Sequence, residues 1–232
     1  MSKKGKFIVI EGTDGSGKTT QFKKLVSRLR SEGFKIVTFD FPQYGKPSSY
    51  FVREYLNGNY GSWQEVGPYR ASVFYALDRF SVGREISNCL NKGKIVLSNR
   101  YVASNMGHQG SKIKNKIERR KFFKWLDELE YGIMNIPRPD LNIVLHMPAK
   151  IAQKLVDRKG AREYVGGLKR DLHEADLGHL RQAEANYLDI VKTFPRDFKV
   201  IECFRQNELL SPKEIHKEIW RIAEKELRKR KK

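Results

Sequence analysis

Apolar and polar residues follow two rhythms along the chain, and these rhythms predict its secondary structure. Short, mostly apolar runs are typical of buried parallel strands. Such runs predict strands at 6–11, 35–41, 94–98, 141–147 and 198–202. Between them apolar residues recur at helical spacing, as Phe22, Leu25 and Leu29 do. This pattern predicts helices at 18–31, 47–57, 66–92, 115–131, 148–157, 173–193 and 212–229.

The alternation of strands and helices predicts the fold class. It favours a three-layer α/β fold in which a five-stranded parallel sheet is flanked by helices on both faces. The sequence contains no internal repeat, low-complexity linker or composition break, so residues 1–232 are expected to form a single domain. Ligands of such sheets bind beyond the carboxyl ends of the strands. The residues that follow the predicted strands are therefore the first candidates for chemistry.

A phosphate-binding motif follows the first predicted strand. Residues 12–19 read Gly-Thr-Asp-Gly-Ser-Gly-Lys-Thr, a complete G-x-x-x-x-G-K-[ST]. The glycines let backbone N–H groups form a nest for phosphate oxygens, and the next helix adds the partial positive charge of its N-terminus. Lys18 is expected to reach the β- and γ-phosphates, and the Thr19 hydroxyl to ligate Mg²⁺. The predicted ATP-binding residues are Gly12, Thr13, Gly15, Ser16, Gly17, Lys18, Thr19 and Thr20.

Composition narrows the setting in which this chemistry takes place. No apolar run approaches the roughly 20 residues of a membrane span, and the N-terminus passes from Lys3-Lys4 directly into the first predicted strand. A membrane protein and a cleavable signal peptide are therefore not expected. Two cysteines, Cys89 and Cys203, have no metal-ligand spacing around them. They favour a reducing cytoplasm and no metal cluster.

The formal net charge of +19 raises the question of nucleic-acid binding. Basic residues concentrate at 112–124, at 158–170 and in a tail at 226–232, without a zinc-finger or aromatic RNA-binding signature. A protein that handles several phosphate groups also needs positive charge, so nucleic acid is not the expected partner. The stretch 158–171 combines glycines with charged side chains, and we expect a lid that excludes water during phosphoryl transfer.

Four further segments indicate what receives the phosphoryl group. They are Asp14 within the motif and the runs 39–45 (FDFPQYG), 74–79 (FYALDR) and 98–110 (SNRYVASNMGHQG). Over about residues 5–205 the chain resembles the thymidylate kinase family. The resemblance implies transfer of the γ-phosphoryl group of ATP to dTMP, giving ADP and dTDP, with Mg²⁺ as cofactor. It also implies a homodimer built on helices that include 66–92.

The resemblance assigns side chains to the base and sugar of the acceptor. Phe41 and Pro42 would shape the thymine pocket, and Tyr75 would stack on the base. Because Tyr75 and Arg79 are four residues apart, they share one face of the predicted helix. The residues that would face the base and sugar are Ser104, Asn105, His108 and Gln109, with His108 near the sugar 2′ position.

The resemblance also assigns the charged groups around the phosphates. Arg79 and Arg100 would hold the acceptor phosphate, and Asp14 would contact the sugar 3′-hydroxyl. The expected metal ligands are Asp14, Thr19 and Glu174. Arg158 and Arg162 of the lid would neutralise charge on the transferring group. The expected catalytic residues are Lys18, Asp14, Arg100, Arg158 and Arg162.

The chain departs from the family pattern at three positions. Gly15 stands where some members carry an arginine, and members without that arginine place it in the lid. Gln43 replaces an arginine that helps hold the acceptor phosphate, with Lys46 and Arg53 as candidates to substitute for it. Asn99 replaces an acid that assists Mg²⁺ binding, and a neutral amide is a poorer ligand.

Other functions predict other features. A deoxynucleoside kinase acts on an uncharged 5′-hydroxyl and needs a general base rather than arginines for an acceptor phosphate. A nucleic-acid-binding P-loop ATPase fits the net charge and predicts hydrolysis stimulated by DNA or RNA, with affinity that falls steeply with salt. An inactive relative is a third reading, motivated by Gln43 and Asn99.

Overall fold

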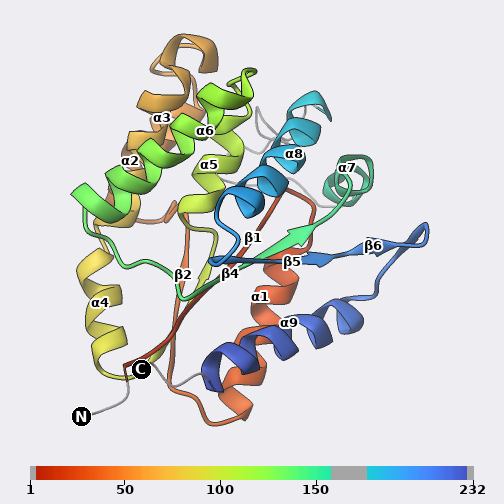
Figure 1. Cartoon of the computed structure of the whole chain (residues 1–232). Coiled ribbons are helices and arrows are strands. Elements are labelled where there is room, and N and C mark those ends of the chain that lie inside the picture. Colours follow the sequence, from red (N-terminus) through yellow and green to blue (C-terminus); the bar gives the residue numbers. More distant parts are fainter. Residues whose placement is uncertain (1–3, 158–176, 229–232) are drawn as a thin grey trace.

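A computed structural model describes residues 4–157 and 177–228, and a parallel sheet forms its centre. The strand order is β2-β3-β1-β4-β5, and every neighbouring pair is parallel (Figure 1). The strands are β1 (Phe7–Gly12), β2 (Ile36–Asp40), β3 (Ile95–Asn99), β4 (Leu141–His146) and β5 (Phe198–Glu202). The predicted α/β class and its five strands are confirmed, with each end within one residue of the prediction.

Helices cover both faces of this sheet. They are α1 (Lys18–Ser31), α2 (Tyr50–Leu56), α3 (Trp63–Phe80), α4 (Gly83–Asn91), α5 (Val102–Gly110), α6 (Lys116–Asp127), α7 (Ala149–Asp157), α8 (Leu177–Thr193) and α9 (Pro212–Arg228). Short elements are the 3-10 turn η1 (Pro47–Ser49), the π-helical turn η2 (Glu128–Ile133) and the hairpin of β6 (Phe204–Arg205) and β7 (Glu208–Leu209). Figure 1 shows α1 and α9 on one face of the sheet and α5, α6 and α8 on the other.

Alternating side chains of the strands build two apolar cores. On β1, Ile8 and Ile10 pack with α1 and α9, whereas Phe7 and Val9 pack with α4, α5 and α6. All four side chains are completely buried. The strand is therefore apolar on both faces, as the sequence pattern of a central parallel strand requires. Glu11 near the end of this strand, and the polar residues that follow the strand, lie at the carboxyl edge of the sheet.

The prediction of one helix at 66–92 is wrong, because two helices, α3 and α4, occupy this stretch. Ser81 ends α3: its hydroxyl donates to the Asp78 carbonyl oxygen at 2.7 Å. Val82 then has a φ of −114° and a ψ of 5°, outside the helical range. The break lets α4 turn against β3, where Ile86 and Leu90 are buried. The hydrophobic spacing continues through the break and does not reveal it.

One helix, α5, was not predicted, and two of its glycines explain why. Gly107 and Gly110 are residues that disfavour helices. A Cβ at Gly107 would lie 2.9 Å from the Tyr187 ring, and a Cβ at Gly110 would lie 2.8 Å from the Phe123 ring. Both glycines therefore allow α8 and α6 to pack closely on α5. This helix begins directly beyond β3 and forms one wall of the cavity described below.

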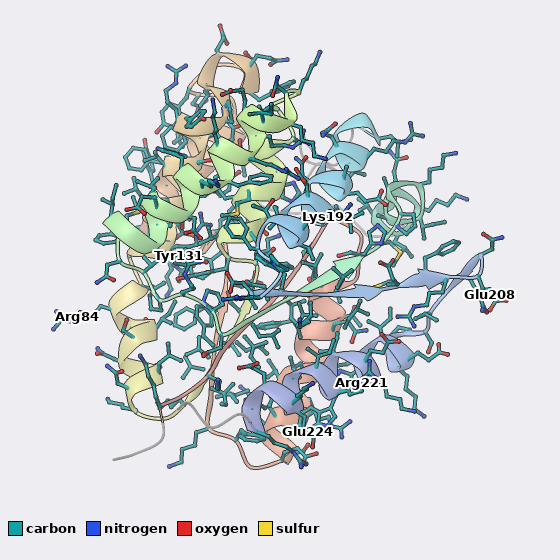
Figure 2. The ribbon with its side chains drawn as sticks, in the orientation of Figure 1. Arg84, Tyr131, Lys192, Glu208, Arg221 and Glu224 are labelled. Atoms are coloured by element: carbon teal, nitrogen blue, oxygen red, sulfur yellow. The ribbon has the colours of Figure 1, made fainter. Side chains whose placement is uncertain are left out.

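Exposed basic side chains of the described residues come from several different helices. Figure 2 labels Arg84 on α4, Lys192 on α8 and Arg221 on α9, which are three separate helices. All three residues are exposed. Across the two described ranges of the chain, none of the helices combines the length and the hydropathy that a bilayer span requires.

Candidate active site

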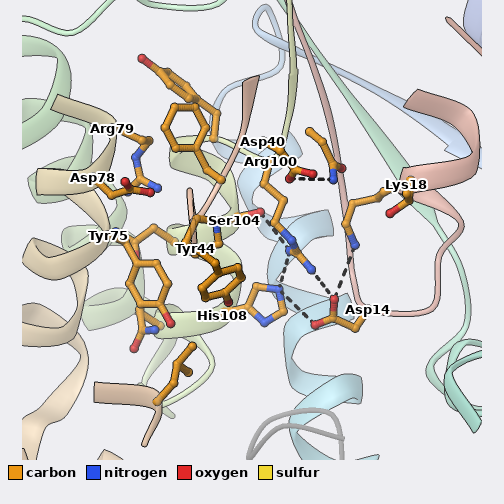
Figure 3. Close-up of a pocket in the computed structure, with 18 of the residues that line it drawn as sticks. Asp14, Lys18, Asp40, Tyr44, Tyr75, Asp78, Arg79, Arg100, Ser104 and His108 are labelled. Atoms are coloured by element: carbon orange, nitrogen blue, oxygen red, sulfur yellow. Dashed lines mark hydrogen bonds and ion pairs between the residues drawn. The ribbon is translucent and has the colours of Figure 1, made fainter. Parts of the chain in front are cut away.

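A cavity of about 370 Å³ opens at the carboxyl ends of β1, β2 and β3, between the phosphate-binding motif at 12–19, called the P-loop below, and helices α3 and α5 (Figure 3). It brings together most of the residues that the sequence singles out. These are Asp14, Gly15, Gly17, Lys18, Thr19, Phe41, Pro42, Tyr75, Arg79, Arg100, Ser104, Asn105, His108 and Gln109. The P-loop residues Gly12, Thr13, Ser16 and Thr20 do not line it.

The P-loop is folded tightly against α7. A Cβ added at Gly15, where φ is +81°, would lie 2.1 Å from the Ala152 carbonyl oxygen. No side chain fits there while α7 keeps its place, which accounts for glycine at this position. The Lys18 ammonium donates to the Thr13 carbonyl oxygen at 2.7 Å and lies 3.8 Å from Asp14 Oδ1. Lys18 is thus held inside the loop, with its charge beside the Asp14 carboxylate.

Arg100 lies at the centre of the cavity, on a strained turn. Its φ of 67° belongs to the left-handed region that non-glycine residues rarely adopt. Its guanidinium pairs with Asp14, and Nη1 lies 3.1 Å from Ser104 Oγ and 3.2 Å from His108 Nε2. Burial alone would lower the pKa of Arg100, but Asp14 together with Glu11 and the nearby tyrosines outweighs burial, and the pKa is raised. Arg100 therefore stays charged, with an anionic partner that another anion can replace.

Glu11 holds this turn in place, and the sequence analysis assigned it no role. Its buried carboxylate accepts hydrogen bonds from Tyr101 N at 2.7 Å, from Ser104 Oγ at 2.6 Å and from Tyr187 Oη at 3.1 Å. Burial raises the pKa of Glu11, and the hydrogen bond from Ser104 only partly opposes this effect. Since Ser104 also contacts the Arg100 guanidinium, Glu11 helps to fix the position of that group through Ser104. Ser104 thereby faces Glu11 and Arg100, whereas the prediction placed it against base and sugar.

The opposite end of the cavity offers an aromatic ring and two amide acceptors. Tyr75 lines this end and packs edge-on against Tyr55. The side chains of Asn105 and Gln109 are nearly fully buried. Asn105 donates to the Ser72 carbonyl oxygen at 3.0 Å. The oxygens Asn105 Oδ1 and Gln109 Oε1 have no hydrogen-bond partner among the described residues, which leaves both able to accept a hydrogen bond from a ligand.

Arg79 lies at this same end, on the far side of Arg100 from Lys18 (Figure 3). Its Nε and Nη2 atoms donate to the two carboxylate oxygens of Glu130 at 2.5 and 2.7 Å. The two side chains are 3% and 0% exposed, so the ion pair is buried. The assignment of the acceptor phosphate to Arg79 stays a prediction. Glu130 already compensates the charge that this role requires.

Neither candidate replacement for the missing arginine lines the cavity. Gln43 donates through its backbone N–H to Asp78 Oδ2 at 2.8 Å and through Nε2 to Asp78 Oδ1 at 3.2 Å. Arg53 donates to the carbonyl oxygens of Tyr44 and Lys46 at 2.9 and 3.0 Å. Gln43 and Arg53 therefore brace the loop after β2, and neither brings a cation into the described cavity.

Asp40 also lines the cavity, and the sequence analysis gave it no role. It ends β2 opposite Asn99, which ends β3 and donates through Nδ2 to Asp40 Oδ1 at 2.9 Å. Although Asp40 opens into the cavity, the surrounding protein displaces water and raises the pKa of its carboxyl. Its place near the end of the strand predicted at 35–41 was the available signal. The contact with Asn99 depends on strand order, which the sequence alone did not give.

Several predictions fall outside the described residues. They are the lid at 158–171 with Arg158 and Arg162, the candidate metal ligand Glu174, and residues 229–232 of the basic tail. The described part of the site is thus the P-loop, the turn at Arg100 and the walls formed by α3 and α5.

Comparison with known sequences gives one consistent result. The sequence model of the thymidylate kinase family matches residues 10–219. The chain is 31% identical over 228 residues to the thymidylate kinase of Pelotomaculum thermopropionicum, covering 97% of this chain and 95% of that protein. It is 28% identical over 184 residues to the thymidylate kinase of Mycobacterium tuberculosis, covering 79% of this chain and 84% of the relative.

A solved structure agrees at the level of the fold. The thymidylate kinase of Candida albicans superposes with a TM-score of 0.73 at 21% identity, covering 97% of this chain and 93% of that one. The similarity therefore extends over nearly the whole of both chains.

Proposed function

The chain belongs to the thymidylate kinase family, and we propose that the cavity beside its P-loop transfers the γ-phosphoryl group of ATP to dTMP, giving ADP and dTDP. The observation that carries this assignment is one continuous cavity that joins Lys18 of the P-loop, Arg100 and the amide acceptors of α5. It offers a phosphate-donor site at one end and a base site at the other.

Phosphoryl transfer asks the protein mainly for positioning and for compensation of charge. Lys18 and the P-loop amides hold the donor phosphates. Arg100 exchanges its Asp14 partner for the acceptor phosphate, and the released Asp14 carboxylate accepts a hydrogen bond from the sugar 3′-hydroxyl. The attacking phosphate oxygen is already ionised, so the reaction needs no general base.

The far end of the cavity fits a pyrimidine that carries a proton on N3. Tyr75 presents a ring for stacking, and the oxygens of Asn105 and Gln109 accept that N–H. Cytosine has no proton on N3 and would leave buried acceptors unsatisfied. His108 lies 4.0 Å from Asp14, between the two ends of the cavity (Figure 3). In this assignment the sugar binds beside it.

Mg²⁺ fits the phosphate end of the cavity. Among the described residues no cluster of three acidic, histidine or cysteine side chains forms a complete metal site. Mg²⁺ usually binds through one or two carboxylates together with substrate phosphates and water. The carboxylate of Asp14 and the hydroxyl of Thr19 line this end, and Glu174 remains a proposed third ligand. When bound, the ion neutralises charge on the phosphates.

The wider assignments are also proposals. We propose that the chain acts as a single domain in the cytoplasm, and the free thiols of Cys89 and Cys203 support that compartment. We propose a homodimer through α2 and α3, which expose Phe51, Leu77 and Phe80. Light scattering on a size-exclusion column would report twice the chain mass. A monomer at micromolar concentration would contradict the dimer.

A coupled assay of ADP release tests the reaction. ATP and Mg²⁺ are held constant while dTMP, dUMP, dCMP, dGMP and thymidine are offered in turn. We expect release with dTMP and little with dCMP or dGMP. Release with thymidine instead would indicate a nucleoside kinase, and release that requires DNA or RNA would indicate a nucleic-acid-dependent ATPase. The family match does not favour either alternative.

A further inference from the structure

Two facing side chains, Asp40 and Asn99, close the ends of β2 and β3 at the phosphate end of the cavity. They are the last paired residues of these strands, and the Asn99 amide donates to Asp40 Oδ1 at 2.9 Å (Figure 3). Both residues line the cavity together with Lys18 and Thr19 of the P-loop. The pair therefore faces the place where donor phosphates bind.

The two members of the pair contribute different things. Asn99 is only 6% exposed, and its oxygen Oδ1 is buried without a hydrogen-bond partner among the described residues. The amide thus turns its donor end toward Asp40 and offers no charge. Asp40 opens into the cavity, and no cation lies within ion-pair distance of it in the described parts of the chain. Its carboxylate is a fixed negative charge that a cation in the cavity can meet.

Strand order explains why this position matters. In P-loop enzymes an acid at the end of a sheet strand assists the nucleotide-bound Mg²⁺, in concert with the P-loop hydroxyl. In this sheet β3 lies directly beside β1, and β3 ends in the amide of Asn99. The acid of Asp40 lies one strand further out, on β2, and the amide at its side holds it toward the cavity.

We propose that Asp40 supplies the carboxylate that binds the water shell of the nucleotide-bound Mg²⁺, and that Asn99 is the positioning residue that orients Asp40. This inference rests on the Mg²⁺-dependent transfer proposed above. It also accounts for the amide at position 99. An aspartate there would place two carboxylates within hydrogen-bonding distance, and their repulsion would drive one of them to take up a proton.

Binding of Mn²⁺ in the presence of ATP, followed by electron paramagnetic resonance without dTMP, tests the proposal. Asp40→Asn keeps the shape of the side chain and an oxygen that can accept from Asn99, so the variant is expected to fold. We expect Mn²⁺ to bind about 10- to 100-fold more weakly. The affinity for ATP in excess EDTA is expected to stay at the parent value, because the lost interaction involves only the metal.

The reciprocal swap sharpens the result. Asp40→Asn combined with Asn99→Asp returns one carboxylate and one amide to the facing positions, and we expect Mn²⁺ affinity to recover to within about tenfold of the parent. Glu85→Gln on α4, an exposed position, is the control for the change in net charge.

Each outcome separates this inference from the proposed function. Parent-like Mn²⁺ binding by Asp40→Asn overturns the role of Asp40. Equal losses of Mn²⁺·ATP and of metal-free ATP also overturn it, because they indicate a merely structural contact. A parent protein that binds no Mn²⁺·ATP, or releases no ADP with dTMP, contradicts the proposed function instead.

Discussion

Two pairs of side chains close neighbouring strands at the same edge of the sheet, and they differ in how their charges are met. Asp40 lies opposite Asn99 on β2 and β3, and His146 lies opposite Glu202 on β4 and β5. Asn99 gives Asp40 a hydrogen bond but no positive charge. His146 instead bridges two carboxylates, Glu202 at 2.5 Å and Glu184 at 2.9 Å.

The difference distinguishes a binding site at a sheet edge, where a charge lacks an ion-pair partner in the described part of the chain, from a structural contact, where the charges are paired within the protein. On the side of β2 and β3, a negative charge is left open to a cavity that also holds Lys18 and Arg100. On the side of β4 and β5, acid and base satisfy each other, and Glu184 also accepts from the backbone N–H of Ala149 at 2.9 Å. We call these the open side and the closed side. Substitutions are expected to cost activity on the open side and stability on the closed side.

The largest effect is expected from Lys18→Ala on the open side. Loss of the cation that meets the donor phosphates should lower kcat about 10³-fold or more, or about 4 kcal/mol of transition-state stabilisation. ADP release with saturating ATP and dTMP measures this change. Lys23→Ala, an exposed position on the same helix, is the matched control. Turnover within tenfold of the parent would contradict the role of Lys18.

Arg100→Ala is expected to have the next largest effect. Removal of the acceptor-phosphate ligand should lower kcat/KM for dTMP about 10²-fold, since a hydrogen-bonded charge pair with the substrate is lost. ATP affinity without dTMP should be retained, which calorimetry can verify. Arg84→Ala on α4 serves as the control at an exposed position. An unchanged kcat/KM for dTMP would remove Arg100 from the acceptor site.

His146→Asn tests the closed side, where the opposite pattern is expected. The substitution breaks the bridge between Glu184 and Glu202, and the free energy of unfolding should fall by about 1–2 kcal/mol. Activity should stay close to that of the parent, because the cavity lining does not include His146. Urea denaturation and the ADP assay together measure both quantities. A large loss of kcat with unchanged stability would reverse the distinction between the two sides.

The smallest effect is expected from pH, and it too belongs to the closed side. The hydrogen bond to Glu184, with Glu202 beside it, raises the pKa of His146 to about 9 from the usual 6.5. A raised pKa means that the folded protein binds the proton on His146 more tightly than the unfolded protein does. The stabilisation is therefore complete below about pH 6.5 and is lost as the pH rises through about 9. We expect a loss of about 1 kcal/mol across this range, reduced by partial exposure of the trio to solvent.

The comparison of parent and His146→Asn isolates this effect. The parent should lose stability toward pH 9 while the variant changes less, as measured by urea denaturation at each pH. At the acid end, the pKa of Glu184 is lowered by His146 against the opposing effect of burial, so its contribution is lost only as the pH falls below about 4.5. Identical pH profiles in the two proteins would contradict the titration of His146.

Much of the fold was readable because the three inner strands are buried on both faces and all five strands are mostly apolar. Runs such as Phe7–Gly12 differ from their surroundings along the whole element, so the bounds could be located to within one residue. Helix ends depend on single side-chain contacts, such as Ser81 with the Asp78 carbonyl oxygen. The predicted helix at 66–92 is wrong for this reason, since a local hydrogen bond is invisible in a hydrophobic pattern.

The candidate site was readable where its residues belong to one motif. Lys18, Thr19 and Arg100 were predicted because each stands in a recognisable sequence motif, and the structure brings all three to one cavity. Asp40 was not singled out, because its proposed role depends on a hydrogen bond from Asn99, which lies on another strand. Glu11 was likewise overlooked as the last polar residue of an apolar run, although its carboxylate anchors the turn at Arg100. Contacts between strands require the sheet order, which sequence spacing does not contain.

The approach of the Ala152 carbonyl oxygen to Gly15 has a consequence for recombining this enzyme with its relatives. A chimera that imports only a P-loop with an arginine at this position would collide with α7, since even a Cβ would lie 2.1 Å from that oxygen. The graft has to bring its own version of α7 (Ala149–Asp157) as well. The loop and the helix are far apart in the sequence but have to be exchanged together. Chimeras that take the two segments from different relatives should therefore rarely be active.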